Sequence, residues 1–261
     1  MLSKVKLQLL KVGKRQLPIH DFVRQLNRIV RRVSYSTHRF QYKIEWSVDN
    51  PEHFDHFMDL HFQWNRNRAS FPMERGVFSS FALSNDKENK GNTLDLCCGD
   101  GFYTYFFYSL RSEKVVGIDF DPSAIKWAKK NFKTPNLEFI EGDIRSSIPD
   151  GPFDNIIWDA AIEHFTESEI ISLMSRIKSV MKDKGILSGY TIVEPDHDGK
   201  HLHQHEYEFH DKEDLARFLT PYFKNVQVIS TVYPMRTNLY FYASDGELPF
   251  ESNLVLTKHR S

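Results

Sequence analysis

A short glycine turn between a buried strand and a helix constrains the fold of this chain more than any other feature. Residues 93–97 form a strand pattern, and glycines follow at Gly99 and Gly101. Glycine permits positive φ and lets a ligand approach the backbone closely, and the first amides of a following helix have no partner inside that helix. The pattern predicts that a nucleotide-like cofactor binds at the carboxyl end of the first strand of an open α/β sheet.

An acidic residue at the end of the second predicted strand supports this prediction. Residues 114–119 end in Asp119, which follows Gly101 by the spacing at which an acidic side chain contacts ribose hydroxyls. Helical patterns alternate with the strand patterns, which favours a parallel sheet with helices on both faces. Further strands are predicted at residues 137–141, 154–159 and 186–192, and a closing hairpin at 226–233 and 238–243.

Helix signals lie between these strands. Residues 102–110 are predicted to form the helix that follows the glycine turn. Thr166 and Glu169 have the spacing of a capping box, in which each side chain bonds the backbone of the other residue. The helix that they open is expected to continue to the pair Lys184-Gly185.

Five segments in this order resemble the motifs of class I S-adenosylmethionine (SAM) methyltransferases. The segments are residues 94–101 (Leu-Asp-Leu-Cys-Cys-Gly-Asp-Gly), 117–121, 137–144, 153–159 and 184–189. The resemblance covers roughly residues 90–245. It implies an α/β, Rossmann-like, seven-stranded sheet of strand order 3-2-1-4-5-7-6, with the last strand antiparallel and an N-terminal helical cap. Cys97 stands where the family usually has its first glycine, and this narrows the room beside the methionine part of the cofactor.

The same resemblance implies SAM as the cofactor. It places the ribose on Asp119, the adenine near Asp143 and Ile144, and the ring of Phe120 against the adenine. The complete set of expected cofactor-binding residues is Asp95, Cys97, Gly99, Gly101, Asp119, Phe120, Asp143, Ile144 and Asp159.

Glu163 and His164 follow the fourth predicted strand and are the candidate catalytic residues. They resemble the Glu-His element found after this strand in many small-molecule methyltransferases. A hydroxyl acceptor must lose its proton as the methyl group arrives, and an imidazole titrates near neutral pH. We therefore expect His164 to act as the base and Glu163 to orient it. The alternative is that His164 only caps the next helix or completes a loop.

A second group of histidines follows the fifth predicted strand: His201, His203 and His205. Together with the Glu-His pair they could supply ligands for a divalent metal. Some methyltransferases use a Glu-Glu-His set after strand four, but Ala160 stands in place of the first glutamate. We therefore expect no metal, and we expect His205 or Tyr207 to contact the acceptor.

The N-terminal region is basic, whereas the whole chain has a net charge of −1. Residues 1–43 hold 11 Lys and Arg side chains and one acidic residue, so the remainder is acidic. Residues 19–33 have apolar side chains at helical spacing with arginines on the other face, which predicts a basic amphipathic helix. This helix is expected either to pack on its own domain or to rest on anionic lipid or another polyanion.

Three regions follow from these patterns: a basic arm over 1–43, a helical lid over 44–90, and a methyltransferase domain over 91–261. Regions before the first strand often cover the methyl donor in the resembled family. One or two of Trp64, Arg68 and Arg75 are therefore expected to reach the active site.

The expected function is methyl transfer to a small-molecule or glycan-type acceptor, at a hydroxyl. The alternatives are a SAM-fold subunit that binds without catalysis, and a methyltransferase acting on nucleic acid; an NAD-type dehydrogenase fits the third and fourth motifs less well. The net negative charge of the chain after residue 43 disfavours binding along an extended nucleic acid, which is itself a polyanion. The only cysteines are Cys97 and Cys98, which are adjacent, so we expect a reduced, cytoplasmic protein with possible peripheral contact to membrane through residues 1–33.

Overall fold

The computed structural model describes residues 18–48, 71–83, 90–193, 205–233, 236–248 and 250. The chain forms two compact units, Met1–Arg68 and Ala69–Ser261. The first unit contributes one described helix, and the second unit contains the sheet and the candidate site.

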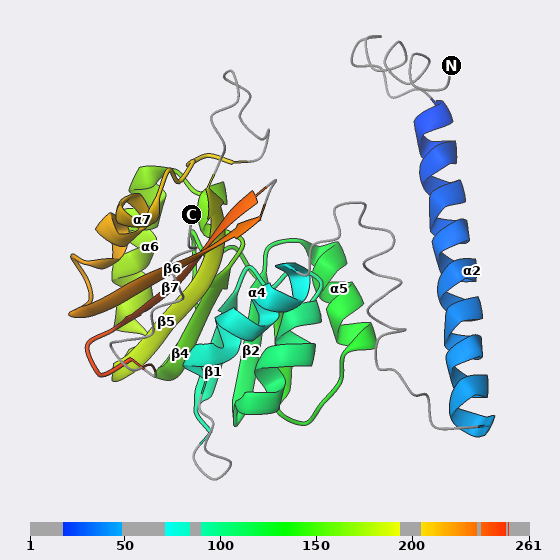
Figure 1. Ribbon diagram of the computed structural model, residues 1–261, viewed down its shortest axis with the longest axis horizontal. Coiled ribbons are helices and arrows are strands. Elements are labelled where there is room, and N and C mark those ends of the chain that lie inside the picture. Colours follow the sequence, from blue (N-terminus) through cyan, green and yellow to red (C-terminus); the bar gives the residue numbers. More distant parts are fainter. Residues whose placement is uncertain are drawn as a thin grey trace, which may run out of the picture. The chain divides into compact units, whose positions relative to one another are not determined.

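The second unit is built on one seven-stranded sheet in the order β3-β2-β1-β4-β5-β7-β6, which confirms the predicted topology (Figure 1). Strands β1 to β5 run parallel to one another, and β7 runs antiparallel to both β5 and β6. The strands are β1 (Asn92–Leu96), β2 (Lys114–Asp119), β3 (Leu137–Glu141), β4 (Phe153–Asp159), β5 (Met181–Val193), β6 (Asn225–Tyr233) and β7 (Arg236–Ser244).

Helices cover both faces of the sheet because alternate strand residues point to opposite faces. Leu94, Leu96 and Trp158 pack into the main core together with α6 (Glu167–Ser179) and α7 (Lys212–Leu219). On the opposite face, α5 (Pro122–Asn131) packs against β3, and α4 (Phe71–Ser79) with the short helix η1 (Ser80–Ala82) packs against β5.

Helix α6 starts with the predicted capping box but ends earlier than the sequence patterns suggest. The box is present on Thr166 and Glu169, yet the helix ends at Ser179 and β5 begins at Met181. The reason is sheet pairing: the N–H of Phe153 donates to the carbonyl of Val180 at 2.9 Å, and Met181 pairs with Phe153. The prediction that the helix continues to Lys184-Gly185 was therefore wrong.

The predicted helix over residues 102–110 is irregular. A π-helical segment, η2 (Thr104–Tyr108), continues into a 3-10 turn, η3 (Ser109–Arg111). Two side-chain contacts accompany this distortion. The Thr104 hydroxyl lies 2.6 Å from the carboxylate of Asp95, and the Asn136 amide donates to the carbonyl of Ser109 at 2.9 Å. Such π segments often occur beside functional sites.

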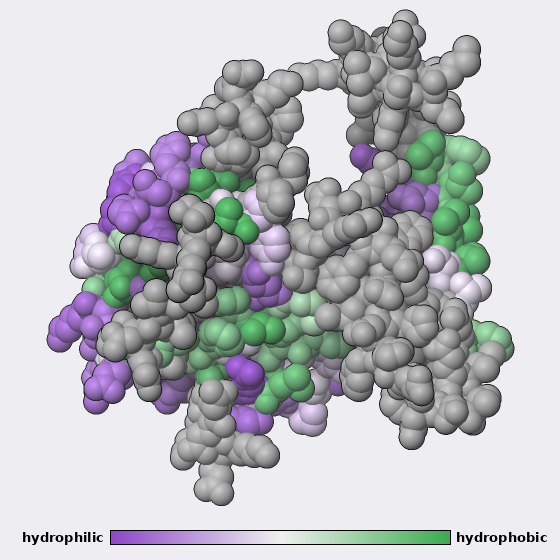
Figure 2. All heavy atoms as spheres, viewed as in Figure 1, coloured by the Kyte–Doolittle hydropathy of each residue, from purple (hydrophilic) through white to green (hydrophobic). Residues whose placement is uncertain are grey.

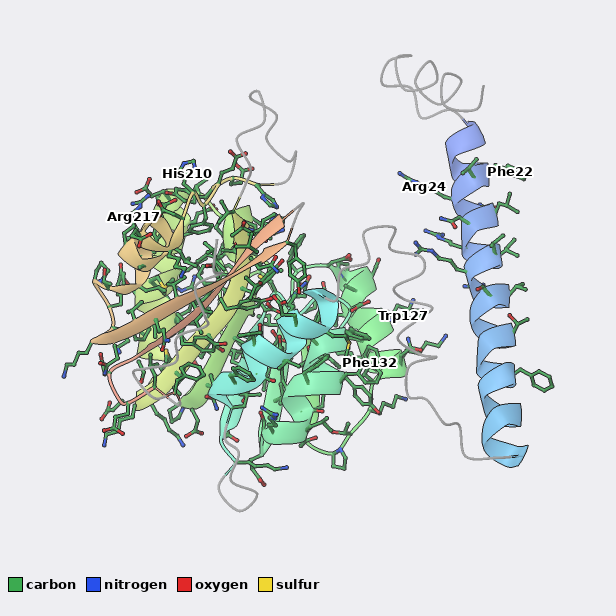
Figure 3. All side chains as sticks on the ribbon, in the orientation of Figure 1. Phe22, Arg24, Trp127, Phe132, His210 and Arg217 are labelled. Carbon is green, nitrogen blue, oxygen red and sulfur yellow. The ribbon has the colours of Figure 1, made fainter. Side chains whose placement is uncertain are left out.

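The first unit contains α2 (Pro18–Val48), which runs beyond both residue 33 and the boundary expected at residue 43. Apolar side chains gather along one side of the helix, and Phe22 and Arg24 project from different sides (Figures 2 and 3). The exposed apolar residues are Phe22, Val23, Leu26, Ile29, Val30, Val33 and Phe40. Among the described residues, no helix has the length and apolar content needed to span a membrane.

Candidate active site

The turn after β1 has the backbone geometry that its glycines permit. Cys97, Gly99 and Gly101 have φ angles of 58°, 56° and 79°. A β-carbon on Gly99 would meet no atom within 4 Å, so this part of the turn faces open space and a ligand can approach its backbone. A β-carbon on Gly101 would lie 2.5 Å from the ring of Phe139, so this glycine is needed for internal packing. The left-handed backbone conformation of Cys97 costs a residue other than glycine about 1–2 kcal/mol.

Asp119 is fixed by this turn at the end of β2. Its carboxylate accepts the N–H of Gly99 at 2.8 Å and the N–H of Asp121 at 2.9 Å. Each carboxylate oxygen keeps a further lone pair, so the group can still accept two hydroxyl donors from a ligand. This arrangement fits the predicted contact with the ribose of SAM.

A cavity of about 410 Å³ lies beside the turn, where the loops after β1, β2, β3 and β4 meet. It brings together five residues selected from the sequence: Cys97, Phe120, Asp143, Ile144 and His164. The Phe120 side chain is exposed, which leaves its ring available for stacking. The lining therefore combines an open aromatic ring, a buried aliphatic side chain and a carboxylate, a set of groups suited to a purine nucleoside.

Two further lining residues, Arg145 and Phe165, were missed by the sequence interpretation. The guanidinium of Arg145 lies 4.4 Å from the centre of the Phe165 ring and its Nε lies 2.7 Å from the Glu169 carboxylate. The position of Arg145, two residues after Asp143, was the only sequence signal for it. Its contact with Phe165 joins two loops and becomes visible only in the tertiary structure.

Asp95 and Asp159 are buried on the face covered by α4. Burial raises the pKa of Asp95 to about 8, although the Thr104 hydroxyl acts in the opposite direction. The Asp159 carboxylate accepts Arg75 Nε at 2.7 Å, the Tyr108 hydroxyl at 2.9 Å and the Ser79 hydroxyl at 3.1 Å. These contacts make Asp159 an anchor for α4; its contact with the cofactor stays a prediction.

Helix α4 is held over the sheet by two adjacent charged residues. Arg75 lies 4.2 Å from the centre of the Tyr103 ring. Burial disfavours its charge, but Asp159, Tyr103 and Tyr108 together raise the pKa of Arg75. Glu74 accepts hydrogen bonds from β6 and β7, including that of the Tyr240 hydroxyl at 2.8 Å. Arg75 thus reaches the end of β4, whereas Trp64 and Arg68 lie outside the described residues.

Glu163 and His164 lie in the short helix η4 (Ile162–His164), directly after β4. The Glu163 side chain is 5% exposed, and one of its carboxylate oxygens accepts the Thr191 hydroxyl at 3.1 Å. Burial raises the pKa of Glu163, while the neighbouring histidines lower it. His164 lines the cavity, so the pair connects the cofactor region with the space beyond β4.

The segment after β5 is bound to this pair through its backbone. The carbonyl of Glu163 accepts the N–H of Glu206 at 2.9 Å and the N–H of Tyr207 at 3.1 Å. The rings of His164 and His205 meet edge to face, with their centroids 5.1 Å apart. One donor atom from each of Glu163, His164 and His205 lies within 4.8 Å of the others.

Tyr207, the other expected acceptor contact, points to α7. Its hydroxyl donates to Asp214 at 2.8 Å, and Arg217 also contacts it. His201 and His203 lie outside the described residues. Burial raises the pKa values of the Cys97 and Cys98 thiols, which disfavours the nucleophilic thiolate form.

Residues 93–185 match a family model described as a methyltransferase domain. An uncharacterised methyltransferase from Synechocystis sp. is 31% identical over 104 residues, which are 39% of this chain and 47% of that protein. Ribosomal protein L11 methyltransferase from Thermosipho africanus is 33% identical over 115 residues, which are 40% of this chain and 43% of that protein. The chain therefore spans less than half the length of each of these relatives.

A solved structure described as a complex of DhpI with SAH has the same fold. It superposes with a TM-score of 0.51 at 18% identity, covering 81% of this chain and 94% of that one. The strand order and the glycine turn are those of the class I SAM-dependent methyltransferase fold, and the segment 93–185 within it resembles a methyltransferase domain. SAM is the methyl donor of this class, and the open face of Gly99 and the fixed carboxylate of Asp119 fit it.

Proposed function

We propose that this protein transfers the methyl group of SAM to a hydroxyl of a small-molecule or glycan-type acceptor. The observation that carries the proposal is the position of His164, which lines the same cavity as the predicted adenine contacts, next to the buried Glu163. An acceptor that enters beyond β4 would meet these two side chains and the methyl group of SAM together.

The reaction needs alignment and removal of one proton. A lone pair of the acceptor oxygen forms the new O–CH₃ bond, the C–S bond breaks, and its electron pair converts the sulfonium to a neutral thioether. The cofactor carries the activated methyl group, and the protein supplies proximity and excludes water. Glu163 and His164 are the groups assigned to help the hydroxyl lose its proton.

The acceptor class can be tested with SAM carrying an isotopic label in its methyl group. The purified protein is incubated with three separate fractions: small metabolites and cell-envelope glycans, ribosomal proteins, and RNA. Mass spectrometry of the products should find the label in the first fraction. Label in ribosomal protein would instead favour an acceptor like that named for the Thermosipho africanus relative, and label in RNA would favour the nucleic-acid alternative.

We also propose that α2 holds the protein at an anionic membrane surface. The support is the row of exposed apolar side chains with Arg24, Arg28, Arg31 and Arg32 on the same helix, because such helices bind the interface between headgroups and acyl chains. The full chain should pellet with phosphatidylserine vesicles at low salt and much less at about 1 M salt. Failure to pellet at low salt would refute this location.

A further inference from the structure

Three potential metal ligands converge at the acceptor side of the proposed active site. They come from two segments: Glu163 and His164 from η4, and His205 from the segment after β5. One donor atom of each lies within 4.8 Å of the other two. Two ligands of one tetrahedral zinc ion, each about 2.1 Å from the metal, lie about 3.4 Å apart, so side-chain rotations that bring the donors roughly 1 Å closer would complete the set.

The backbone and a neighbouring side chain hold these donors in place. Hydrogen bonds from the N–H groups of Glu206 and Tyr207 to the carbonyl of Glu163 tie the chain next to His205 to the chain next to His164. Thr191 donates to one carboxylate oxygen of Glu163, which fixes the orientation of the carboxylate. Partners of this kind orient the ligands of metal sites.

The expectation that no metal binds rested on Ala160, which stands where some methyltransferases have a first glutamate. The structure supplies a different third donor, His205, one of the three histidines that the sequence offered as ligands, and places it beside Glu163. Two imidazoles and one carboxylate favour first-row transition ions over Mg²⁺, which prefers ligands that are all oxygen. Three protein ligands also leave coordination positions open for an acceptor oxygen.

We propose that Glu163, His164 and His205 bind one divalent transition-metal ion, on which the acceptor hydroxyl docks. The inference rests on the proposed function and specifies how the hydroxyl is activated. The cation lowers the pKa of an oxygen bound to it. The hydroxyl proton then leaves to solvent, and the oxygen lone pair attacks the methyl group as the C–S bond breaks. In this arrangement His164 acts as a ligand instead of a base.

Metal binding is tested on the full-length protein without any acceptor. After dialysis against EDTA and removal of the chelator, Mn²⁺ alone is titrated by calorimetry and by its electron paramagnetic resonance signal. One Mn²⁺ per chain should bind, and Mg²⁺ should bind at least about 10-fold more weakly. Absence of Mn²⁺ binding up to about 1 mM, an affinity of only about −4 kcal/mol, would overturn the proposal.

Variants localise the site. Glu163→Gln and His205→Gln should each weaken Mn²⁺ binding by at least about 100-fold, and Thr191→Val by about 10-fold. The matched control is His210→Gln, an exposed histidine on the same segment as His205, which should bind Mn²⁺ as the wild type does. Equal loss in the control would overturn the assignment. Circular dichroism of each metal-free variant establishes that it is folded.

The metal site and the proposed function can be refuted independently of each other. Methyl transfer that is fully retained in EDTA would overturn the metal site and return His164 to the role of base. Specific Mn²⁺ binding together with SAM binding, but with no transfer to any of the three acceptor fractions, would support the metal site and count against the proposed function.

Discussion

The cofactor side and the acceptor side of this site are built in different ways. On the cofactor side, the decisive contacts join residues close in sequence: Gly99 bonds Asp119, and Thr104 bonds Asp95. At the end of β4, Arg75 bonds Asp159 across 84 residues, and on the predicted acceptor side Glu163 accepts backbone N–H groups of residues 206 and 207. The β1–β2 unit thus fixes the predicted ribose contact, whereas the predicted acceptor side depends on contacts between distant segments. Changes on the two sides should therefore have separable effects.

The largest expected effect concerns His164 on the acceptor side. The substitution His164→Ala should lower turnover by roughly 100- to 10,000-fold, because it removes a group that helps the acceptor lose its proton, either as the base or as a ligand of the proposed metal ion. SAM affinity should change little, because the main predicted cofactor contacts lie on the other loops. Steady-state kinetics and calorimetry with SAM measure the two quantities. Full turnover in the variant would mean that the enzyme works by positioning alone, and an amine or carbon acceptor would then be favoured.

The next effect concerns Asp119 on the cofactor side. The substitution Asp119→Ala removes hydrogen bonds to a charged acceptor, each contributing about 1.5–3 kcal/mol. SAM affinity measured by calorimetry should fall by roughly 10- to 1000-fold. Because Asp119 also holds the Gly99 amide, Asp119→Asn serves as the milder variant that keeps the shape of the side chain. Unchanged SAM affinity in both folded variants would contradict the ribose assignment.

Arg75 tests the long-range contacts at the end of β4. The substitution Arg75→Met leaves the buried Asp159 carboxylate without its cation and should lower the free energy of unfolding by about 3 kcal/mol. The control is Arg217→Met, whose ion pairs with Glu167 and Asp214 lie at the surface and should contribute at most about 1 kcal/mol. Urea denaturation measures both. Equal losses of unfolding free energy in the two variants would show that burial does not strengthen the ion pair between Arg75 and Asp159.

A further test concerns the pH dependence of stability, whose slope is modest at any one pH. The folded protein raises the pKa of Asp95 to about 8, so it holds this proton more tightly than the unfolded chain does. The contribution of this carboxyl to stability therefore falls as the pH rises from about 4 to 8, with a steepest slope on the order of 1 kcal/mol per pH unit. The variant Asp95→Asn should lack this loss and gain stability relative to wild type between pH 5 and pH 8 in denaturant titrations. A constant difference between the two proteins would contradict the raised pKa.

The sequence by itself determined the sheet and most of the cofactor side. The glycine turn followed from a local motif, and the strand order and the cavity residues Phe120, Asp143 and Ile144 followed from the family resemblance that such motifs carry. Parallel strands deliver their carboxyl ends to one edge of the sheet, so residues that end different strands meet there. The patterns also placed the start of α6 correctly, through a capping box that is complete within four residues.

Only the tertiary structure decided which groups share the acceptor side. The end of α6 depended on pairing between Phe153 and Met181, which no helical period reveals. The attachment of α4 to Asp159 and the convergence of His205 with Glu163 depended on contacts between distant segments. Local motifs encode conformation through short-range hydrogen bonds, whereas these contacts exist only after the sheet has brought separate loops to the same edge.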